Sequence, residues 1–225
     1  MIVFDYKIGR IPVGRDIKHI KADFFDGTVP SWLSGTNAVV ANNCLSISAG
    51  SMDVNLPVII KNAINVGGTT KSLFLLESLA FKVNNFRVLN GLSSSSIELV
   101  SSTGWKLGLY GVFASSNDKH NYFKVTDSNG NVIVNELVGT TSGGTERSVM
   151  ISPTDVAYQT RPKNIEFVIQ PEIGNIHICT NDSVAYSYWN LADVDIDWTG
   201  EWKFQITSNS AMCMSSIEME LQQNI

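Results

Sequence analysis

Short segments that alternate apolar and polar residues run through most of this 225-residue chain, and turn-forming residues separate them. There are about twelve such segments, with turn signals roughly every 8–12 residues. Successive side chains of a β-strand point to opposite faces, so each segment is typical of a strand with one buried face. In residues 201–207, for example, Trp202, Phe204 and Ile206 share one face. This rhythm predicts an all-β fold, an antiparallel β-sandwich.

A β-hairpin is the sharpest local prediction. Residues 122–127 and 132–137 are both strand-like, and Asn129 and Gly130 stand between them. Asn-Gly between two alternating segments is the strongest short-range hairpin signal, because both residues tolerate positive φ.

The stretch from residue 22 to residue 51 organises the rest of the chain. The letters FFDG at residues 24–27 lead into PSW at 30–32, and a short alternating segment follows at 44–48. Glycine supplies positive φ and proline pre-sets φ, so the stretch is expected to form a strand, a tight corner, a loop and a second strand.

This opening, together with the closing pattern WTGEWKFQITSNSAMCMSSIEMEL at residues 198–221, resembles the concanavalin A-like lectin/glucanase domains, the laminin-G-like jelly rolls. The resemblance covers roughly residues 22–222. It implies a jelly roll in which the final strand lies beside the first, with a carbohydrate-related function.

Glucanases that look similar carry a Glu-x-Asp-x-x-Glu run, which sets nucleophile and acid/base on one strand face. The chain has no such run. Glu218 and Glu220 lie two residues apart in the last strand, where a solvated sheet face is expected. The sequence therefore predicts that the protein is not an enzyme. The alternative is a glycoside hydrolase whose carboxylates come from separate strands, for example Glu77 and Glu166.

Composition narrows the class of partner. The net charge is −5 and charged residues make up only 16%, below the roughly 25% of soluble domains. Nucleic acid is disfavoured because phosphate binding needs clustered Lys and Arg. No stretch approaches the ~20 apolar residues of a membrane span. The first residues lack the pattern of a signal peptide, so we expect the chain to be made in the cytoplasm and to stay there or to leave by cell lysis.

We expect one domain, residues 22–225, because the chain has no internal repeat and no long linker. Residues 1–21 are locally basic and are expected to form an N-terminal arm or attachment segment. Cys44, Cys179 and Cys213 each fall in an apolar, strand-like segment, which is typical of reduced core thiols. One disulfide plus one free thiol is the alternative.

Aromatic residues near the C-terminal third suggest a carbohydrate site. Aromatic ring faces stack on the apolar faces of pyranose rings, and Asn can bind hydroxyl groups. The predicted site consists of Tyr186, Tyr188, Trp189 and Asn190, with Tyr188 and Trp189 expected to be exposed. Trp202 is expected in the core instead, because it is in phase with Phe204.

The densest acidic cluster is Asp193, Asp195 and Asp197. If residues 193–198 form a strand, these carboxylates point to one side, where Ca²⁺ would relieve their repulsion. A solvated strand face is the alternative, and we expect no other cofactor.

The composition is rich in Ser, Asn and Gly, poor in charge and lectin-like, and no signal peptide is recognised. These features together predict a non-catalytic β-sandwich protein of a bacteriophage virion, made in the host cytoplasm and assembled as a homo-oligomer. It would bind host-surface glycan or neighbouring virion subunits. A stand-alone carbohydrate-binding module is the other binding alternative.

Overall fold

The chain is described by a computed structural model for residues 15–35, 38–56, 76–89, 95–112, 122–137, 162–180 and 187–224. Within these residues the regular secondary structure is almost entirely β-strand, with one short 3₁₀ helix, η2 (Pro171–Ile173). The strands are β1 (Arg15–Ala22), β2 (Leu33–Gly35), β3 (Val39–Ala41), β4 (Cys44–Ile47), β5 (Gly50–Asn55), β6 (Ser78–Val88), β7 (Ser95–Ser101), β8 (Lys106–Val112), β9 (Tyr122–Thr126), β10 (Val132–Leu137), β11 (Lys163–Gln170), β12 (Asn175–Thr180), β13 (Ser187–Asn190), β14 (Trp202–Ser208), β15 (Met212–Met214) and β16 (Ser216–Asn224).

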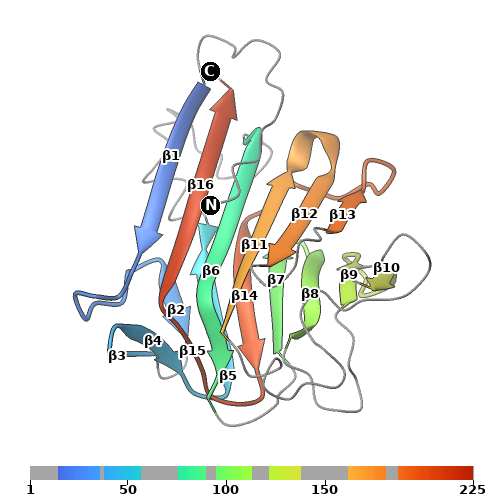
Figure 1. Cartoon of the computed structure of the whole chain (residues 1–225). Coiled ribbons are helices and arrows are strands. Elements are labelled where there is room, and N and C mark those ends of the chain that lie inside the picture. Colours follow the sequence, from blue (N-terminus) through green and yellow to red (C-terminus); the bar gives the residue numbers. More distant parts are fainter. Residues whose placement is uncertain are drawn as a thin grey trace.

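The described strands form two antiparallel sheets that pack face to face, with the larger sheet in front in Figure 1. The nine-stranded sheet runs β13-β12-β11-β6. From β6 it continues as β16-β1 along one part of that strand and as β15-β4-β3 along the other. The seven-stranded sheet has the order β10-β9-β8-β7-β14-β5-β2. The predicted antiparallel β-sandwich is therefore confirmed.

Aromatic side chains join the two sheets at the centre of the core. The rings of Phe81 on β6 and Phe204 on β14 are stacked, with centroids 3.8 Å apart, and both side chains are fully buried. Phe167 on β11 packs against Phe204 at 5.9 Å. Trp202 is also buried, as its phase with Phe204 predicts. Burial of these large apolar side chains is the main favourable term in folding.

Two local predictions hold in detail. Strands β9 and β10 form the expected hairpin, in which the Asp127 carboxylate accepts hydrogen bonds from the backbone N–H groups of Asn129 and Asn131. Gly130 in this turn has φ of 86°, a value that favours glycine. The final strand β16 pairs with β1 over the whole length of β1, as the jelly-roll resemblance implies.

Residues 15–21 of the expected arm are part of β1 and hence of the nine-stranded sheet, whereas residues 1–14 lie outside the described residues. Cys44 and Cys213 are free thiols, and the Arg87 Nε–H group donates a hydrogen bond to Cys213 Sγ at 3.0 Å. The side chain of Cys179 lies outside the described part. No helix in the described ranges has the length and hydrophobicity that a membrane span needs.

The Phe81–Phe204 contact generates a stability prediction. Phe204→Ala should lower the free energy of unfolding by about 3–5 kcal/mol, because it removes a fully buried ring and leaves a cavity. Urea denaturation followed by tryptophan fluorescence measures this change. Val39→Ala is the control, since Val39 is exposed on β3. Equal denaturation midpoints for the two variants would contradict this account of the core.

Candidate functional site

The predicted aromatic site is divided between two faces of β13. Tyr188 is 45% exposed, its hydroxyl group donates to Asn175 Oδ1 at 2.7 Å, and its ring contacts His177. Trp189 is only 7% exposed, its ring stacks on Phe123, and its indole N–H group donates to a Glu136 carboxylate oxygen. The expectation that Trp189 is exposed is therefore wrong. Its side chain faces the core, where it packs against the Phe123 ring.

Of the other two members of this predicted site, only Asn190 belongs to the described residues. Asn190 is exposed, but its side-chain oxygen accepts the backbone N–H group of Ala192. Tyr186 lies outside the described residues. Burial lowers the pKa of His177, the residue on which the Tyr188 ring rests.

Residues 193–198 are a turn and irregular loop between β13 and β14, so the predicted strand is wrong. Asp side chains bond their own backbone two residues on, which competes with strand pairing. Asp197 does this: its carboxylate accepts both the backbone N–H and the hydroxyl group of Thr199. In the described part of the chain, no group of three or more His, Cys, Asp or Glu side chains could hold a metal ion. Asp193, Asp195 and Asp197 are thus not brought together as Ca²⁺ ligands.

Glu77 and Glu166, the carboxylates proposed for a hydrolase, both lie in or beside the nine-stranded sheet. Glu77 accepts a hydrogen bond from the Gln222 side-chain amide at 3.0 Å. Glu166 lies opposite Lys82. Burial raises the pKa of Glu166, the charge of Lys82 lowers it, and the carboxylates of Glu218 and Glu220 raise it further. Acidic and basic side chains therefore alternate across neighbouring strands on this face of the sheet.

The outward surface of the seven-stranded sheet differs from that of the nine-stranded sheet in its chemistry. Its five middle strands present mostly polar side chains there, alternating with the core residues of the other face. We call this surface the polar face. Its residues are Ser51, Asp53, Asn55, Ser96, Glu98, Val100, Lys106, Gly108, Tyr110, Tyr122, Lys124, Thr126, Lys203, Gln205 and Thr207.

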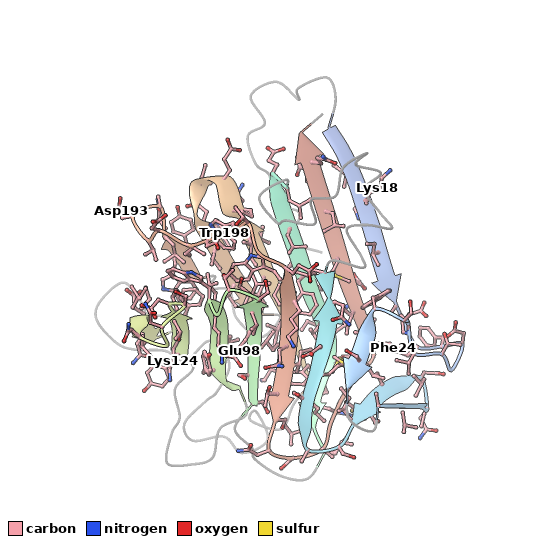
Figure 2. All side chains as sticks on the ribbon, turned by 180° about the vertical axis from the view of Figure 1, so that it is seen from behind. Lys18, Phe24, Glu98, Lys124, Asp193 and Trp198 are labelled. Carbon is pink, nitrogen blue, oxygen red and sulfur yellow. The ribbon has the colours of Figure 1, made fainter. Side chains whose placement is uncertain are left out.

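Strand register places one row of the polar face across the middle of the sheet. Asp53 pairs with Gln205, Gln205 with Glu98, Glu98 with Gly108, and Gly108 with Lys124. Figure 2 shows Glu98 over the middle of the sheet with Lys124 further toward one edge. Neighbouring strands lie about 4.8 Å apart, so the backbones of Asp53 and Glu98 are roughly 10 Å apart.

Glu98 is the most constrained side chain of this row. It is only 9% exposed although it points away from the core. The Tyr110 hydroxyl group donates to Glu98 Oε1, and the Ser96 hydroxyl group donates to Glu98 Oε2 at 3.2 Å. A Cβ atom at Gly108 would lie 2.7 Å from Glu98 Cγ. Gly108 therefore leaves the space in which the Glu98 side chain lies flat.

A cation lies at each end of the row, Lys124 at one end and Lys203 beside Asp53 at the other. Lys124 Nζ lies 4.9 Å from the centroid of the Tyr110 ring and 5.6 Å from that of Tyr122, within cation–π range. At the other end, Lys203 Nζ lies 2.6 Å from one oxygen of Asp53, and the side-chain amide of Gln205 donates to the other oxygen at 2.8 Å. The polar face thus offers carboxylates, amides, hydroxyls and aromatic rings in fixed positions.

Sequence reasoning did not find this surface as a site. One signal was present: Gly108 alternates with Lys106 and Tyr110, and a glycine in a strand indicates close approach by a neighbour. Nothing in the sequence says that the neighbour is Glu98 or that Gln205 lies on its other side. Those contacts depend on the pairing of strands about a hundred residues apart.

Comparison with known proteins reveals similarity in structure only. No protein-family model matches the sequence, and no curated protein matches it either. Among solved structures, the CBM2 module of the evolved Dit of Lactobacillus casei BL23 phage J-1 is 12% identical, with a TM-score of 0.52 over 95% of this chain and 99% of that chain. The basic winged bean lectin with Tn-antigen is 9% identical, with a TM-score of 0.51 over 92% and 98% of the two chains.

A third neighbour is an inactivated mutant of β-agarase B in complex with agaro-octaose. It is 10% identical, with a TM-score of 0.54 over 98% of this chain and 100% of that chain. Lectin, phage module and agarase share one architecture with this protein. The chain has the concanavalin A-like lectin/glucanase fold. The resemblance drawn from the sequence is confirmed at the level of fold.

The prediction that the protein is not an enzyme is contradicted by these neighbours. An agarase is among the proteins with this fold. The absence of a Glu-x-Asp-x-x-Glu run on one strand is therefore no ground for excluding catalysis. The alternative of a glycoside hydrolase whose carboxylates come from separate strands therefore stays open, since one fold hosts many activities.

Tyr110 gives a prediction about alkaline pH. Burial first, and then the hydrogen bond to Glu98 and the charge of Glu98, raise the pKa of Tyr110 far above the ordinary value. Near pH 10 the wild-type protein and Tyr110→Phe should therefore form the same amount of phenolate, measured by ultraviolet absorbance. One phenolate fewer in the variant would contradict this geometry.

The same shift links pH to stability. Above about pH 10 the unfolded chain loses the Tyr110 proton while the folded protein keeps it. The free energy of unfolding of the wild-type protein should therefore fall relative to that of Tyr110→Phe as the pH rises through this range.

Proposed function

We propose that this protein binds carbohydrate through the polar face. The observation that carries the proposal is the position of Glu98, a nearly buried carboxylate on the outward side of a sheet. The hydroxyl groups of Tyr110 and Ser96 orient this carboxylate, and the absence of a side chain at Gly108 leaves room for it. A carboxylate that is this buried is uncommon unless other groups bind it.

The chemistry of the polar face matches that of a polyhydroxylated ligand. Carboxylates accept hydrogen bonds from hydroxyl groups and form the stronger, charge-assisted kind. The amide of Gln205 and the ammonium groups of Lys124 and Lys203 donate to sugar oxygens. The Tyr110 and Tyr122 rings add apolar surface against the C–H faces of a sugar. Since the row crosses five strands, an oligosaccharide fits it better than a single sugar unit.

The neighbours support the same class of ligand. The β-agarase B structure is a complex with agaro-octaose, and the winged bean lectin structure contains Tn-antigen. Both ligands are named for proteins that share the fold of this chain at low identity. We therefore transfer only the class, carbohydrate, and derive the location from the residues of this chain.

We further propose that the protein serves on a bacteriophage particle and binds host-surface glycan there. The support is the fold shared with a module of a phage Dit protein. The locally basic residues 1–21, of which residues 15–21 belong to β1, are the proposed attachment to the particle. A homo-oligomeric state remains a prediction, which light scattering would test.

A second candidate function is cleavage or transfer of the bound glycan. The specific observation is that Asp53 and Glu98 flank Gln205 in one row, two strands apart. Inverting glycosidases hold their carboxyl groups roughly 6.5–9.5 Å apart, with room for a water molecule. Release of reducing ends from a bound oligosaccharide, abolished in Asp53→Asn, would favour this function over binding alone.

Glu98→Gln tests the binding proposal. The substitution keeps the size of the side chain but removes the charge, so affinity for an oligosaccharide chosen by glycan array should fall roughly tenfold to a hundredfold. Isothermal titration calorimetry measures the affinity, and near-ultraviolet circular dichroism checks the fold. Glu172→Gln is the matched control, because Glu172 is exposed on η2. Unchanged affinity in Glu98→Gln would refute the proposal.

A further inference from the structure

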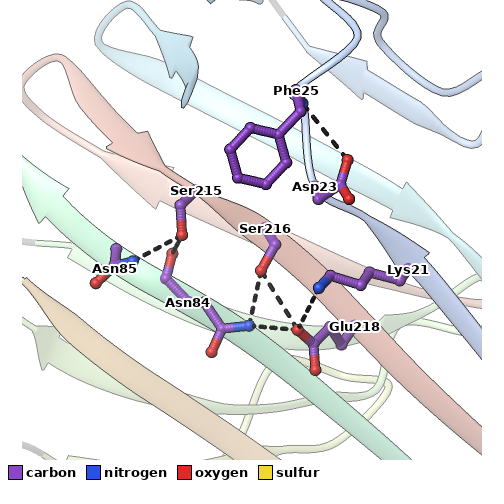
Figure 3. A network of polar contacts seen from close by, with 8 residues as sticks. All are labelled: Lys21, Asp23, Phe25, Asn84, Asn85, Ser215, Ser216 and Glu218. Atoms are coloured by element: carbon purple, nitrogen blue, oxygen red, sulfur yellow. Dashed lines mark hydrogen bonds and ion pairs between the residues drawn. The ribbon is translucent and has the colours of Figure 1, made fainter. Parts of the chain in front are cut away.

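A pocket lies on the outer surface of the nine-stranded sheet, on the opposite side of the sandwich from the polar face. Its volume is about 290 Å³. It forms where β1 and β16 meet the middle of β6 and the start of β11 (Figure 3). We call it the asparagine pocket. Its lining residues are Lys21, Asp23, Phe25, Asn84, Asn85, Asn164, Ser215, Ser216 and Glu218.

An irregularity in β6 creates the asparagine pocket. Along β11 the register shifts, so that Lys163 faces Phe86 while Ile165 faces Val83. Two residues of β6, Asn84 and Asn85, therefore oppose the single residue Asn164, which is the pattern of a β-bulge. Asn85 has φ of 51°, in the left-handed region. Its backbone N–H group donates to Asn164 Oδ1, and its side chain donates to Ser215 Oγ, both at 2.8 Å.

Asn84 lies at the bottom of the pocket and is only 9% exposed. Its side-chain N–H₂ group donates to Ser216 Oγ at 2.8 Å and to Glu218 Oε1 at 3.0 Å. These two bonds fix the orientation of the amide (Figure 3). Within the part of the chain that the structure describes, no donor reaches Asn84 Oδ1. A buried acceptor of this kind is costly to leave without a donor, so a ligand hydroxyl group is favoured there.

An aromatic ring borders the other side of the pocket. Phe24 has φ of 55°, which is uncommon for a bulky residue and costs free energy. The Phe24 side chain is buried, whereas the next residue, Phe25, is 66% exposed. Figure 3 shows the Phe25 ring beside the polar residues of the pocket. The strained backbone at Phe24 therefore accompanies a turn in which the Phe25 ring is exposed to solvent. Phe25 and the polar residues line one concave surface, and small ligands bind in pockets where a few polar groups converge beside apolar surface.

The charges of the pocket limit the ligand further. Lys21 Nζ lies 3.7 Å from Glu218 Oε1, so the cation and this carboxylate offset each other. Asp23 accepts the backbone N–H group of Phe25 and contributes a second carboxylate. An anionic ligand would be repelled by Asp23 and Glu218, because the charge of Lys21 offsets only one of these two carboxylates. A neutral ligand therefore fits better.

We propose that the asparagine pocket binds one neutral pyranose unit, as a second carbohydrate site of the protein. The sugar ring stacks on Phe25, a hydroxyl group donates to Asn84 Oδ1, and Asn85 with Asp23 contacts further hydroxyl groups. The inference rests on the residues of this pocket and not on the polar face. Two sites on opposite surfaces of one sandwich would let the protein contact two glycan chains at once.

Side-chain amide signals in ¹⁵N-labelled full-length protein report on this pocket directly. The probes are glucose, galactose, mannose, N-acetylglucosamine and rhamnose, each titrated separately. We expect at least one sugar to shift the signals of Asn84, Asn85 and Asn164 together. In Phe25→Ala the affinity for that sugar should fall roughly tenfold, a loss equivalent to one stacking contact. Val29→Ala is the matched control, because Val29 is exposed in the same loop.

The outcomes distinguish this proposal from the function proposed for the polar face. Shifts in the asparagine pocket that persist in Glu98→Gln would support two independent sites. No shift of the three asparagines with any of the five sugars would overturn the pocket proposal, whatever the polar face binds. Equal affinity in Phe25→Ala and Val29→Ala would overturn it as well.

Discussion

The stack of Phe81 on Phe204 joins the two sheets at the centre of the core, and burial of these side chains decides which residues of each strand face outward. Alternation along a strand means that whatever packs into the core decides what faces solvent. With Phe204 in the core, Gln205 must face outward, and Glu98 does so because Ile97 and Leu99 are buried. A slip of one residue in β14 would bury Gln205 and expose Phe204. The core therefore specifies the polar face.

The position of Glu98 in the middle strand explains why the polar face has the character of a site. Gln205 on β14 and Gly108 on β8 lie directly beside Glu98 in the neighbouring strands. Tyr110, two residues along β8 from Gly108, donates a hydrogen bond to the Glu98 carboxylate. A carboxylate at a sheet edge would be hydrated and mobile. Held by two hydroxyl groups, Glu98 needs little reordering when a ligand binds, which favours affinity. The asparagine pocket obtains similar rigidity by another route, the bulge at Asn84 and Asn85.

Local patterns predicted the fold well, whereas the site depended on contacts between distant segments. Alternation and the Asn129-Gly130 turn identified the sandwich and its hairpin, since both depend on neighbouring residues. Periodicity failed at residues 193–198, where Asp197 bonds the backbone two residues on and the chain turns. It failed again at Trp189, because alternation gives the period of a strand but not which face is buried. The row from Asp53 to Lys124 needs the register of five strands, which alternation does not supply.

The most direct test of the central claim is a crystal structure of the protein with the oligosaccharide that it binds most tightly. We expect a saccharide chain lying across β5, β14, β7 and β8, with a hydroxyl group within hydrogen-bond distance of a Glu98 carboxylate oxygen. Such a structure would also show whether Asp53 faces the same glycosidic bond. A saccharide bound elsewhere, with the polar face covered only by water, would contradict the account.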